Sequence, residues 1–273
     1  MDVVLPFQYN YMKIATWNVN SIKSRINYVL KFLKKNPVDI LLLQELKCIN
    51  EMFPVNEIKN IGYNSYINGQ KAWNGVAIIS KKKIKILNLK IPTFTSDYQS
   101  RFIETEIKIK KIKKNIKIFC IYLPNGNPID TEKFDYKLEW MKKFNKYIKK
   151  LYQENIPMII GGDFNVIPTD DDVYSPENFK DDACAHPKTR ELYRELLNYG
   201  FTDTVKNFNN GKKNWTYWGY RGNSWLKGNG LRIDHFLTSP EITNLVKKVE
   251  IDREPRSWEK ASDHTPVTIE IKN

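Results

Sequence analysis

The segment Pro157-Met158-Ile159-Ile160-Gly161-Gly162-Asp163-Phe164-Asn165 decides the fold. Its apolar start indicates a buried strand, and the two glycines and Asp163 follow where that strand ends. Strand ends in α/β folds are where a rigid sheet directs side chains from distant parts of the chain towards one point. A carboxylate in such a place is costly unless it is paired or holds a metal. The segment therefore predicts an α/β fold with a functional carboxylate, in preference to a tight turn closed by an Asx hydrogen bond.

Two further polar clusters lie against apolar runs in the same way. Ile40-Leu41-Leu42-Leu43 runs into Gln44-Glu45, and Ser262-Asp263-His264 directly precedes the extended run from Pro266 to Ile271. With Asp163, these clusters place three carboxylates and one histidine at strand ends. The combination predicts a metal-dependent hydrolytic site.

Strand and helix patterns alternate along the rest of the chain, without an internal repeat or a Gly/Ser-rich linker. Apolar residues at helical spacing predict helices over 21–35, 131–155 and 188–199. Extended segments are expected at 13–17, 39–43, 63–67, 75–80, 84–89, 108–112, 115–119, 119–123, 215–220, 231–237 and 267–271. Of these, 63–67, 75–80 and 84–89 are expected to form one hairpin-like region, and 108–112 and 115–119 a pair of antiparallel strands. This pattern predicts one α/β domain over residues 12–273, built of two facing sheets flanked by helices. Residues 1–11 are expected to be an N-terminal extension, with Met1 and Met12 as alternative translation starts.

Composition limits the classes of protein that remain. The chain has 273 residues, of which 41% are hydrophobic, so a packed globular protein is expected. Its formal net charge of +13 favours a polyanionic partner, with lysines that only solvate the surface as the competing explanation. The three cysteines are scattered, which fits a reducing cytosol and offers no zinc site. Because neither a secretory signal nor a membrane-spanning run is visible, we expect a cytoplasmic protein without membrane attachment.

The polar residues at the strand ends suit particular steps of phosphate chemistry. Glu45 offers the hard oxygen that Mg²⁺ or Mn²⁺ requires. Asp163 can take a proton from water, and Asn165, two residues on, can hold that water or a phosphate oxygen on the same side of an extended chain. An imidazolium at His264 would stabilise charge on the oxygens of a scissile phosphate. Asp234 is a candidate for the carboxylate that orients it.

Other polar residues allow two interpretations. Tyr122 and Asn125, at the end of another predicted strand, can contact phosphate. Tyr122 is equally consistent with a core tyrosine whose hydroxyl reaches water. His186 and His235 are expected to be structural.

An aromatic and basic stretch lies in the last third of the chain. It runs over Trp215–Arg221 and continues with Trp225, Lys227 and Arg232. Aromatic residues among cations suit unstacked bases or sugar pockets. At least half of these aromatic residues are nevertheless expected to belong to the core.

Taken together, the segments resemble the exonuclease III family of AP endonucleases, in the endonuclease/exonuclease/phosphatase superfamily. The resemblance extends from about Met12 to Ile271, and its motifs are specific because they occur together and in order. The matching segments are Trp17-Asn18-Val19-Asn20, Leu43-Gln44-Glu45-Leu46-Lys47, Ile121-Tyr122-Leu123-Pro124-Asn125, Gly162-Asp163-Phe164-Asn165, Gly230-Leu231-Arg232-Ile233-Asp234 and Ser262-Asp263-His264.

The resemblance implies a four-layered α/β sandwich, in which two mixed β-sheets pack face to face and are flanked by helices. It implies Mg²⁺-dependent cleavage of double-stranded DNA 5′ to abasic sites, with Mn²⁺ as a substitute. It also implies 3′-phosphodiesterase and 3′-phosphatase activity at blocked 3′ ends, often with 3′→5′ exonuclease activity. We expect the protein to act as a monomer in DNA repair.

The resemblance also implies roles for individual residues. Glu45 would be the principal metal ligand, supported by Asp263 and by Asn18, which would also orient Asp163. Asp163 would activate the attacking water, and Asn165 would position that water or a phosphate oxygen.

The remaining roles concern the phosphate and the sugar. His264, held by Asp234, would bind the scissile phosphate with help from Tyr122 and Asn125. The general base is either Asp163 or an ionised Tyr122, which the sequence leaves open. Tyr217 and Leu231 correspond to the pocket for the abasic sugar, and Arg232 is a further expected substrate contact.

One departure concerns the metal. Some relatives carry Asp where this chain has Asn20, so a second carboxylate near the metal is absent. Either metal affinity is lower, or Glu45 acts with Asp263 and water alone.

Other members of the superfamily are phosphoinositide phosphatases, sphingomyelinases and secreted DNases. The Gly-Leu-Arg-Ile-Asp context, the Gln-Glu-x-Lys motif and the positive charge favour DNA as the substrate. The alternative from another class is a non-catalytic nucleic-acid-binding regulator on the same fold. Lost catalytic residues would mark such a regulator, and here the expected set is intact.

Overall fold

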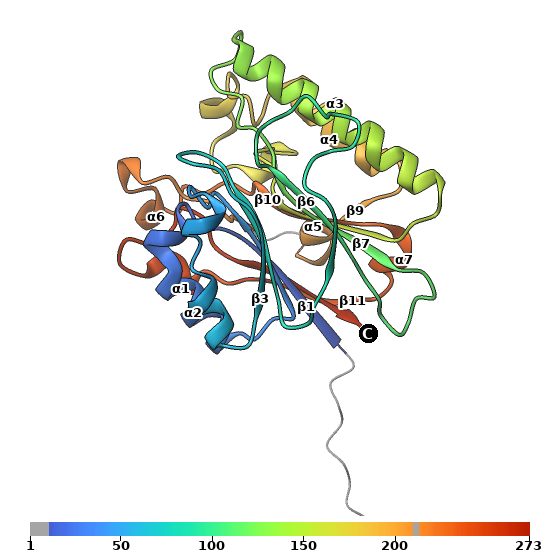
Figure 1. The fold of residues 1–273 in the computed structure, drawn as a ribbon. Helices are drawn as coiled ribbons and strands as arrows, with labels where there is room; N and C mark the ends of the chain where they lie inside the picture. Colours follow the sequence, from blue (N-terminus) through green and yellow to red (C-terminus); the bar gives the residue numbers. More distant parts are fainter. Residues whose placement is uncertain (1–10, 210–212) are drawn as a thin grey trace, which may run out of the picture.

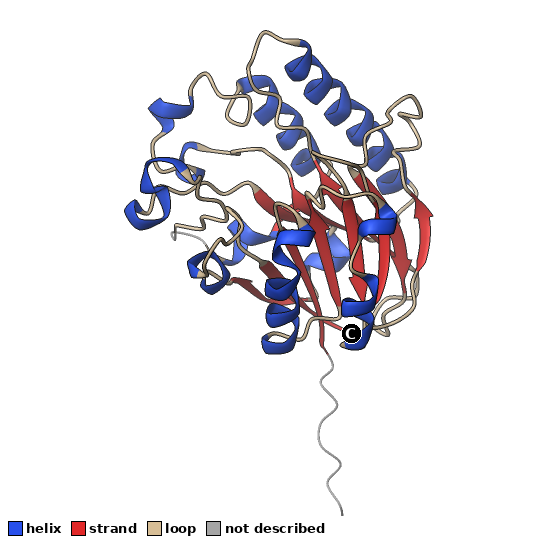
Figure 2. Ribbon diagram, turned by 60° about the vertical axis from the view of Figure 1, so that its left-hand side comes forward, coloured by secondary structure: helices blue, strands red, loops and turns tan. Residues whose placement is uncertain are grey.

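The protein is described by a computed structural model that covers residues 11–209 and 213–273. Two β-sheets face each other in its centre, and helices cover their outer faces (Figures 1 and 2). The strands are β1 (Tyr11–Asn18), β2 (Ile40–Gln44), β3 (Asn64–Asn68), β4 (Val76–Ser80), β5 (Lys85–Asn88), β6 (Phe102–Ile107), β7 (Ile116–Tyr122), β8 (Met158–Asp163), β9 (Thr202–Asp203), β10 (Asp234–Thr238), β11 (Val246–Ile251) and β12 (Val267–Lys272). The helices are α1 (Ile22–Lys35), α2 (Val55–Asn60), α3 (Glu132–Gln153), α4 (Pro187–Asn198), α5 (Thr204–Phe208), α6 (Ser224–Lys227) and α7 (Pro240–Thr243).

Each sheet is mixed. The first has the order β11-β12-β1-β2-β4-β3, and the second has the order β5-β6-β7-β8-β10-β9. In the first sheet β1 and β2 are parallel, in the second β7 and β8 are parallel, and the other pairs are antiparallel. The prediction of two mixed sheets packed face to face is therefore confirmed.

The alternation of side chains along the strands builds the layers. Ile14 and Leu42 of the first sheet pack with Ile118 and Ile159 of the second in one buried cluster between the sheets. The intervening residues of the same strands face outward, where Leu41 and its neighbours pack against α1. Because both faces of the central strands are covered, these strands are apolar throughout instead of alternating apolar with polar residues.

Helices of matching amphipathic pattern cover the two outer faces. The buried face of α1 carries Ile22, Val29 and Phe32, and that of α3 includes Met141 and Phe144. Figure 1 shows α1 and α2 on one side of the sandwich and α3 and α4 on the other. The helices expected at 21–35, 131–155 and 188–199 thus correspond to α1, α3 and α4, with ends shifted by one or two residues.

The strand predictions need four corrections. The sequence analysis predicted neither β9 nor β11, which lie at the edges of the two sheets. Residues 108–112 form no strand, because β7 pairs with the preceding segment Phe102–Ile107, which the sequence analysis missed. The regions predicted at 63–67, 75–80 and 84–89 do not form one unit, since β3 pairs with β4 whereas β5 joins β6 in the other sheet. Residues 215–220 contain only an isolated bridge at Tyr217. Local alternation cannot distinguish these outcomes, because strand pairing is decided by distant partners.

The N-terminal prediction falls mostly outside the described residues. Of the expected extension, residues 1–11, only Tyr11 is described, and it is the first residue of β1, paired with Lys272. Among the helices of the described part, none is long and apolar enough to cross a membrane.

Candidate active site

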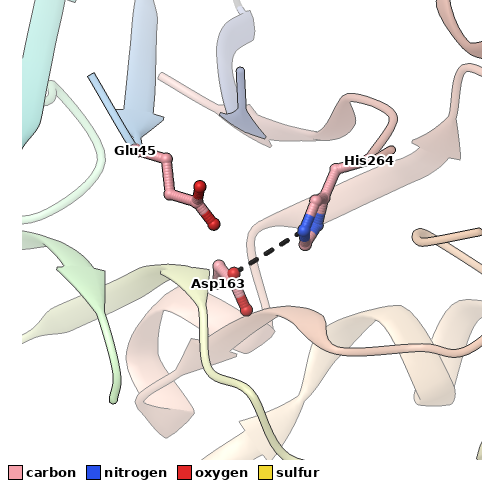
Figure 3. Close-up of side chains that lie close together, drawn as sticks. All are labelled: Glu45, Asp163 and His264. Carbon is pink, nitrogen blue, oxygen red and sulfur yellow. Dashed lines mark ion pairs between the residues drawn. The ribbon is translucent and has the colours of Figure 1, made fainter. Parts of the chain in front are cut away.

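The polar ends of five strands meet at one edge of the sandwich. Asn18 ends β1, Glu45 follows β2, and Tyr122 and Asp163 end β7 and β8. Asp234 begins β10 directly opposite Asp163 in the antiparallel register. Because the two sheets face each other here, side chains far apart in the sequence converge on one point. Figure 3 shows Glu45, Asp163 and His264 directed towards it.

Three of these groups could hold a metal ion. One ligand atom each from Glu45, Asp163 and His264 lies within 4.8 Å of the others. The Nδ2 of Asn18 bridges the two carboxylates, donating to Glu45 Oε1 at 2.8 Å and to Asp163 Oδ2 at 2.9 Å. Carboxylate oxygens are the ligands that Mg²⁺ and Mn²⁺ prefer, so Glu45 and Asp163 fit either ion, whereas His264 could be a ligand only in its neutral form.

Glu45 carries a full negative charge in this setting. Burial alone would raise the pKa of its carboxyl, but the Lys47 ammonium and the Asn18 amide hold that pKa below its usual value. Lys47 Nζ lies 2.9 Å from Glu45 Oε2, and the Tyr122 hydroxyl donates to Oε1 at 2.9 Å. Glu45 itself has a φ of +52°, an uncommon conformation of the kind found at functional sites. The carboxylate is therefore ionised and ready to bind a cation.

Asp163 is buried, with a side chain suited to exchange a proton near neutral pH. Burial raises its pKa to about 7, an effect that nearby Asp234 increases and the charge of His264 opposes. Its Oδ1 accepts from the backbone N–H of Asn165 at 2.9 Å. Its position between the sheets also depends on Gly162, with a φ of +154°, where an added Cβ would lie 2.0 Å from the Ile121 carbonyl oxygen. No other residue fits there, so glycine permits the close approach of β7 and β8 that places Asp163.

His264 is a buried cation. Burial alone would lower the pKa of its imidazole, but the carboxylates of Asp234 and Asp163 raise it to about 10. Its Nδ1 lies 2.9 Å from Asp234 Oδ2, and its Nε2 lies 3.8 Å from Asp163 Oδ2. The other oxygen of Asp234, Oδ1, is buried and has no partner among the described residues. Asp234 is thus placed to orient the ring, as the sequence analysis expects.

Two amides lie beside Asp163. Asn125 Nδ2 donates to Asn165 Oδ1 at 3.0 Å, and Asn165 Nδ2 donates to the carbonyl of Leu123 at 3.0 Å. Asn165 has a φ of +47°, so its backbone is held in the left-handed region. The structure therefore brings Asn125 and Asn165 together next to the carboxylate.

Tyr122 lies in the site, and its environment disfavours ionisation. Burial, followed by the charges of Glu45 and Asp163, raises the pKa of its phenol well above the ordinary value. The Arg101 guanidinium, 4.8 Å from the ring centroid, opposes this only in part. Tyr122 is thus a hydrogen-bond donor at neutral pH in this arrangement.

A small apolar cluster adjoins His264. Leu231 packs with Val173, Cys184 and the partly buried Tyr217, whose ring centroid lies 4.8 Å from that of His264. Tyr217 and Leu231 form a backbone bridge, as do Tyr217 and His264. The two residues expected to bind the abasic sugar are thus neighbours at the edge of the site.

Of the aromatic residues of this stretch, Trp215 and Trp218 are buried in the core, Tyr217 and Trp225 are half-buried, and Tyr220 is exposed. Fewer than half are therefore fully buried, which is less than the sequence analysis expects.

Arg232 does not fit its predicted role as a substrate contact. Its side chain is 1% exposed, and it forms ion pairs with Asp172 at 2.8 Å and Asp203 at 2.7 Å. A guanidinium that is held by two buried carboxylates cannot turn towards DNA without leaving both charges unpaired. Arg232 is instead a structural residue behind the pocket. His235, which contacts Arg232, and His186, which caps α4, are also placed structurally.

Asp263 lies beside the metal cluster but is not part of it. Its Oδ1 accepts from Asn20 Nδ2 at 3.0 Å, and Asn20 Oδ1 accepts from Lys47 Nζ at 2.6 Å. Sequence reasoning assigned no role to Lys47, although it stands two residues after Glu45. Asp263, Asn20, Lys47 and Glu45 therefore form one connected chain of polar contacts.

Comparison with known proteins agrees with this geometry. The model of the Endonuclease/Exonuclease/phosphatase family matches residues 15–264. Exodeoxyribonuclease III of Haemophilus influenzae is 32% identical over 275 residues, covering 96% of this chain and 100% of the relative. The DNA-(apurinic or apyrimidinic site) endonuclease of Dictyostelium discoideum is 29% identical over 96% of this chain and 71% of the relative.

Solved structures share the fold closely. The 3′-5′ exonuclease (NExo) from Neisseria meningitidis superposes with a TM-score of 0.89 at 34% identity, over 96% of this chain and 100% of that chain. An AP endonuclease from Archaeoglobus fulgidus superposes with a TM-score of 0.87 at 34% identity, over 94% and 98% of the two chains. The chain therefore belongs to the Endonuclease/Exonuclease/phosphatase family, among its exodeoxyribonuclease III and AP endonuclease members.

Proposed function

We propose that this DNA-repair nuclease hydrolyses duplex DNA 5′ to abasic sites and removes blocking groups from 3′ ends, with Mg²⁺ as its cofactor and Mn²⁺ as a substitute. The observation that carries the proposal is the convergence of Glu45, Asp163 and His264 within 4.8 Å at the strand ends. A metal ligand, a base and a cation lie there within reach of one phosphate.

Asp163 supplies the general base. With a pKa of about 7, its carboxyl changes protonation near neutral pH, where a base is most effective. It takes a proton from water while the water oxygen attacks phosphorus; the bond from phosphorus to the 3′ oxygen breaks, and the 3′ oxygen leaves with the electron pair and takes up a proton from solvent. The Asn18 amide and the Asn165 N–H fix the carboxylate on both of its oxygens, so it needs little reorganisation for this step.

The raised pKa of Tyr122 supports Asp163 over Tyr122 as the base. A protonated phenol can donate a hydrogen bond but cannot take a proton from water. In this mechanism Tyr122 contacts Glu45 and a phosphate oxygen.

His264 and the two amides bind the phosphate. A charged imidazole, kept protonated by Asp234, stabilises the negative charge that develops on phosphate oxygens. Asn125 and Asn165 add neutral donors on the other side. When bound at Glu45, a divalent cation supplies Lewis-acid stabilisation of the same oxygens.

We propose that Tyr217 and Leu231, which pack together beside His264, form the pocket for the abasic sugar and so select abasic sites. A sugar without a base is small enough for a compact apolar pocket, whereas an intact nucleotide is not. Because every group of the proposed site comes from a single chain, we propose that the protein acts as a monomer. Its three described cysteines are free, consistent with our proposal of a cytoplasmic location. The alternative, a non-catalytic nucleic-acid-binding regulator, is disfavoured because it would not need this complete site.

The test uses three labelled duplexes: one with a single abasic-site analogue, one with a 3′-phosphate and one undamaged. Each is incubated with the protein with and without Mg²⁺. We expect rapid Mg²⁺-dependent cleavage 5′ to the analogue and removal of the 3′-phosphate, with slower degradation of the undamaged duplex.

The matched control is Asp163→Asn, purified in the same way, because it reveals nuclease carried over from the expression host. Activity equal to that of the variant would show contamination only if a mock purification from the same host, without this protein, gave the same rate; otherwise it would overturn Asp163 as the base. DNA binding without cleavage by the wild type would favour the regulator instead.

A further inference from the structure

One buried cation near the site has no role in the mechanism above. Lys137 lies in the second turn of α3, on the face that packs against the second sheet, and its side chain is 0% exposed. Its charge is costly there, because an ammonium loses its hydration on burial. A methionine could fill the same space without this cost, so packing alone does not explain a lysine.

The contacts of Lys137 lead directly to the site. Its Nζ donates to the backbone carbonyl of Asn165 at 2.6 Å and to that of Asn125 at 2.9 Å. The side-chain amides of these two residues are hydrogen-bonded to each other, and the backbone N–H of Asn165 donates to Asp163. One ammonium thus joins the loop after β7 to the loop after β8.

Both loops contact the Lys137 side chain through residues with a positive φ. Gly126, with a φ of +87°, lies so close to the lysine stem that an added Cβ would be 2.6 Å from Lys137 Cδ. Asn165 also has a positive φ, a conformation that costs energy for a residue other than glycine. A residue with positive φ on each loop therefore lies next to the same lysine side chain, Gly126 at its stem and Asn165 at its ammonium.

We propose that Lys137 is a positioning residue for the nuclease reaction: its ammonium holds the Asn125 and Asn165 loops so that both amides face the scissile phosphate. This inference rests on the proposed function. Lys137 does not touch the substrate, and it acts through the two asparagines. A loop displacement of about 1 Å can cost on the order of 100-fold in rate, so loss of this tether should reduce kcat strongly.

The test compares Lys137→Met with the wild type and with Lys142→Met, an exposed lysine on the same helix that serves as the charge-matched control. Methionine keeps the length of the stem and removes the donors. We expect kcat on the abasic-analogue duplex to fall by on the order of 10- to 100-fold, with KM close to that of the control. The melting temperature should fall because two carbonyls lose their donor, so the assay is run well below it.

A double-mutant cycle with Asn125→Ala distinguishes positioning from general damage. If Lys137 acts through Asn125, Lys137→Met should reduce kcat much less in the Asn125→Ala background than in the wild type. Lys137→Gln, which keeps one donor, should lie between Lys137→Met and the wild type. If Lys137→Met does not fold, the cycle is run with Lys137→Gln.

A kcat of Lys137→Met equal to that of the wild type would overturn the proposal. So would a double mutant in which kcat falls by the product of the two single-mutant factors. Absence of cleavage by the wild type would instead overturn the proposed function, so the two failures are distinct.

Discussion

Asp163→Asn is the sharpest perturbation of the proposed chemistry. The substitution keeps the size of the side chain and removes the charge that accepts a proton. In the structure one carboxylate oxygen accepts from Asn18 Nδ2 at 2.9 Å and the other from the Asn165 N–H at 2.9 Å. An amide offers only one acceptor, so one of these donors must face an NH₂ group or move away.

The two consequences differ in size and can be separated. A lost hydrogen bond at a buried donor costs about 1–3 kcal/mol of stability. Part of this loss of stability is offset, because the neutral amide avoids the cost of burying a charged carboxylate. Burial raises the pKa of Asp163, which shows that folding disfavours the charged form. Loss of a positioned base slows the chemical step by on the order of 10²–10⁴, or about 2.7–5.5 kcal/mol of activation free energy. The rate effect should therefore exceed any effect on folding.

Single-turnover cleavage of the abasic-analogue duplex at saturating Mg²⁺ measures the chemical step directly. DNA binding, measured in parallel without metal, should be unchanged or tighter, because one negative charge near the phosphate is removed. Asp171→Asn is the matched control, since that side chain is 85% exposed and the chemical change is the same. A rate within about threefold of wild type, well below the range for base catalysis, would refute the assignment of Asp163.

Four further predictions test the metal, the buried histidine, the pocket and the charge. Glu45→Gln should weaken Mg²⁺ binding, measured by calorimetry, by at least about tenfold. Excess Mg²⁺ should partly restore the nuclease activity of this variant. An unchanged Mg²⁺ affinity would show that Glu45 is not a metal ligand. Without metal, the melting temperature should fall as pH rises from 6.5 towards 10. The reason is that His264, with a pKa of about 10 in the folded protein, binds its proton more tightly there than in the unfolded chain. In His264→Gln the melting temperature should depend less on pH over this range. Tyr217→Ala should raise cleavage of undamaged relative to abasic DNA, and an unchanged ratio would place Tyr217 in the core. A plot of the logarithm of DNA affinity against the logarithm of salt concentration should have a slope of roughly −3 to −6, which corresponds to about four to seven phosphate contacts. A slope near zero would mean that the net charge only solvates the surface.

Much of the fold is readable from the sequence because its central elements have strong local patterns. The apolar runs of β2 and β8 are short, continuous and followed by polar residues, which is typical of strands covered on both faces. The apolar stripes of α1 and α3 recur at helical spacing. The failures occur at the edges, at residues 108–112 and in the assignment of β5 to the second sheet, where pairing depends on distant strands.

The candidate site divides in the same way. Glu45, Asp163 and His264 could be identified from sequence because each polar residue interrupts or borders an apolar run. In the sequence, Arg232 could not be distinguished from an arginine that binds phosphate. Only the structure shows that its side chain is buried and paired with Asp172 and Asp203. Lys137 carried only a weak signal, a basic residue on the apolar face of a helix.

The sequence by itself determined which residues carry the chemistry and which kind of layered fold presents them, because residue type, apolar runs and helical spacing are local properties. Only the tertiary structure decided which groups meet, which are charged and which are structural. Those properties depend on distances between residues that lie far apart in the chain, 145 positions for Asn18 and Asp163 and 243 for Asn20 and Asp263. The pKa of about 7 at Asp163 has the same origin, since the two facing sheets create both its burial and its charged neighbours.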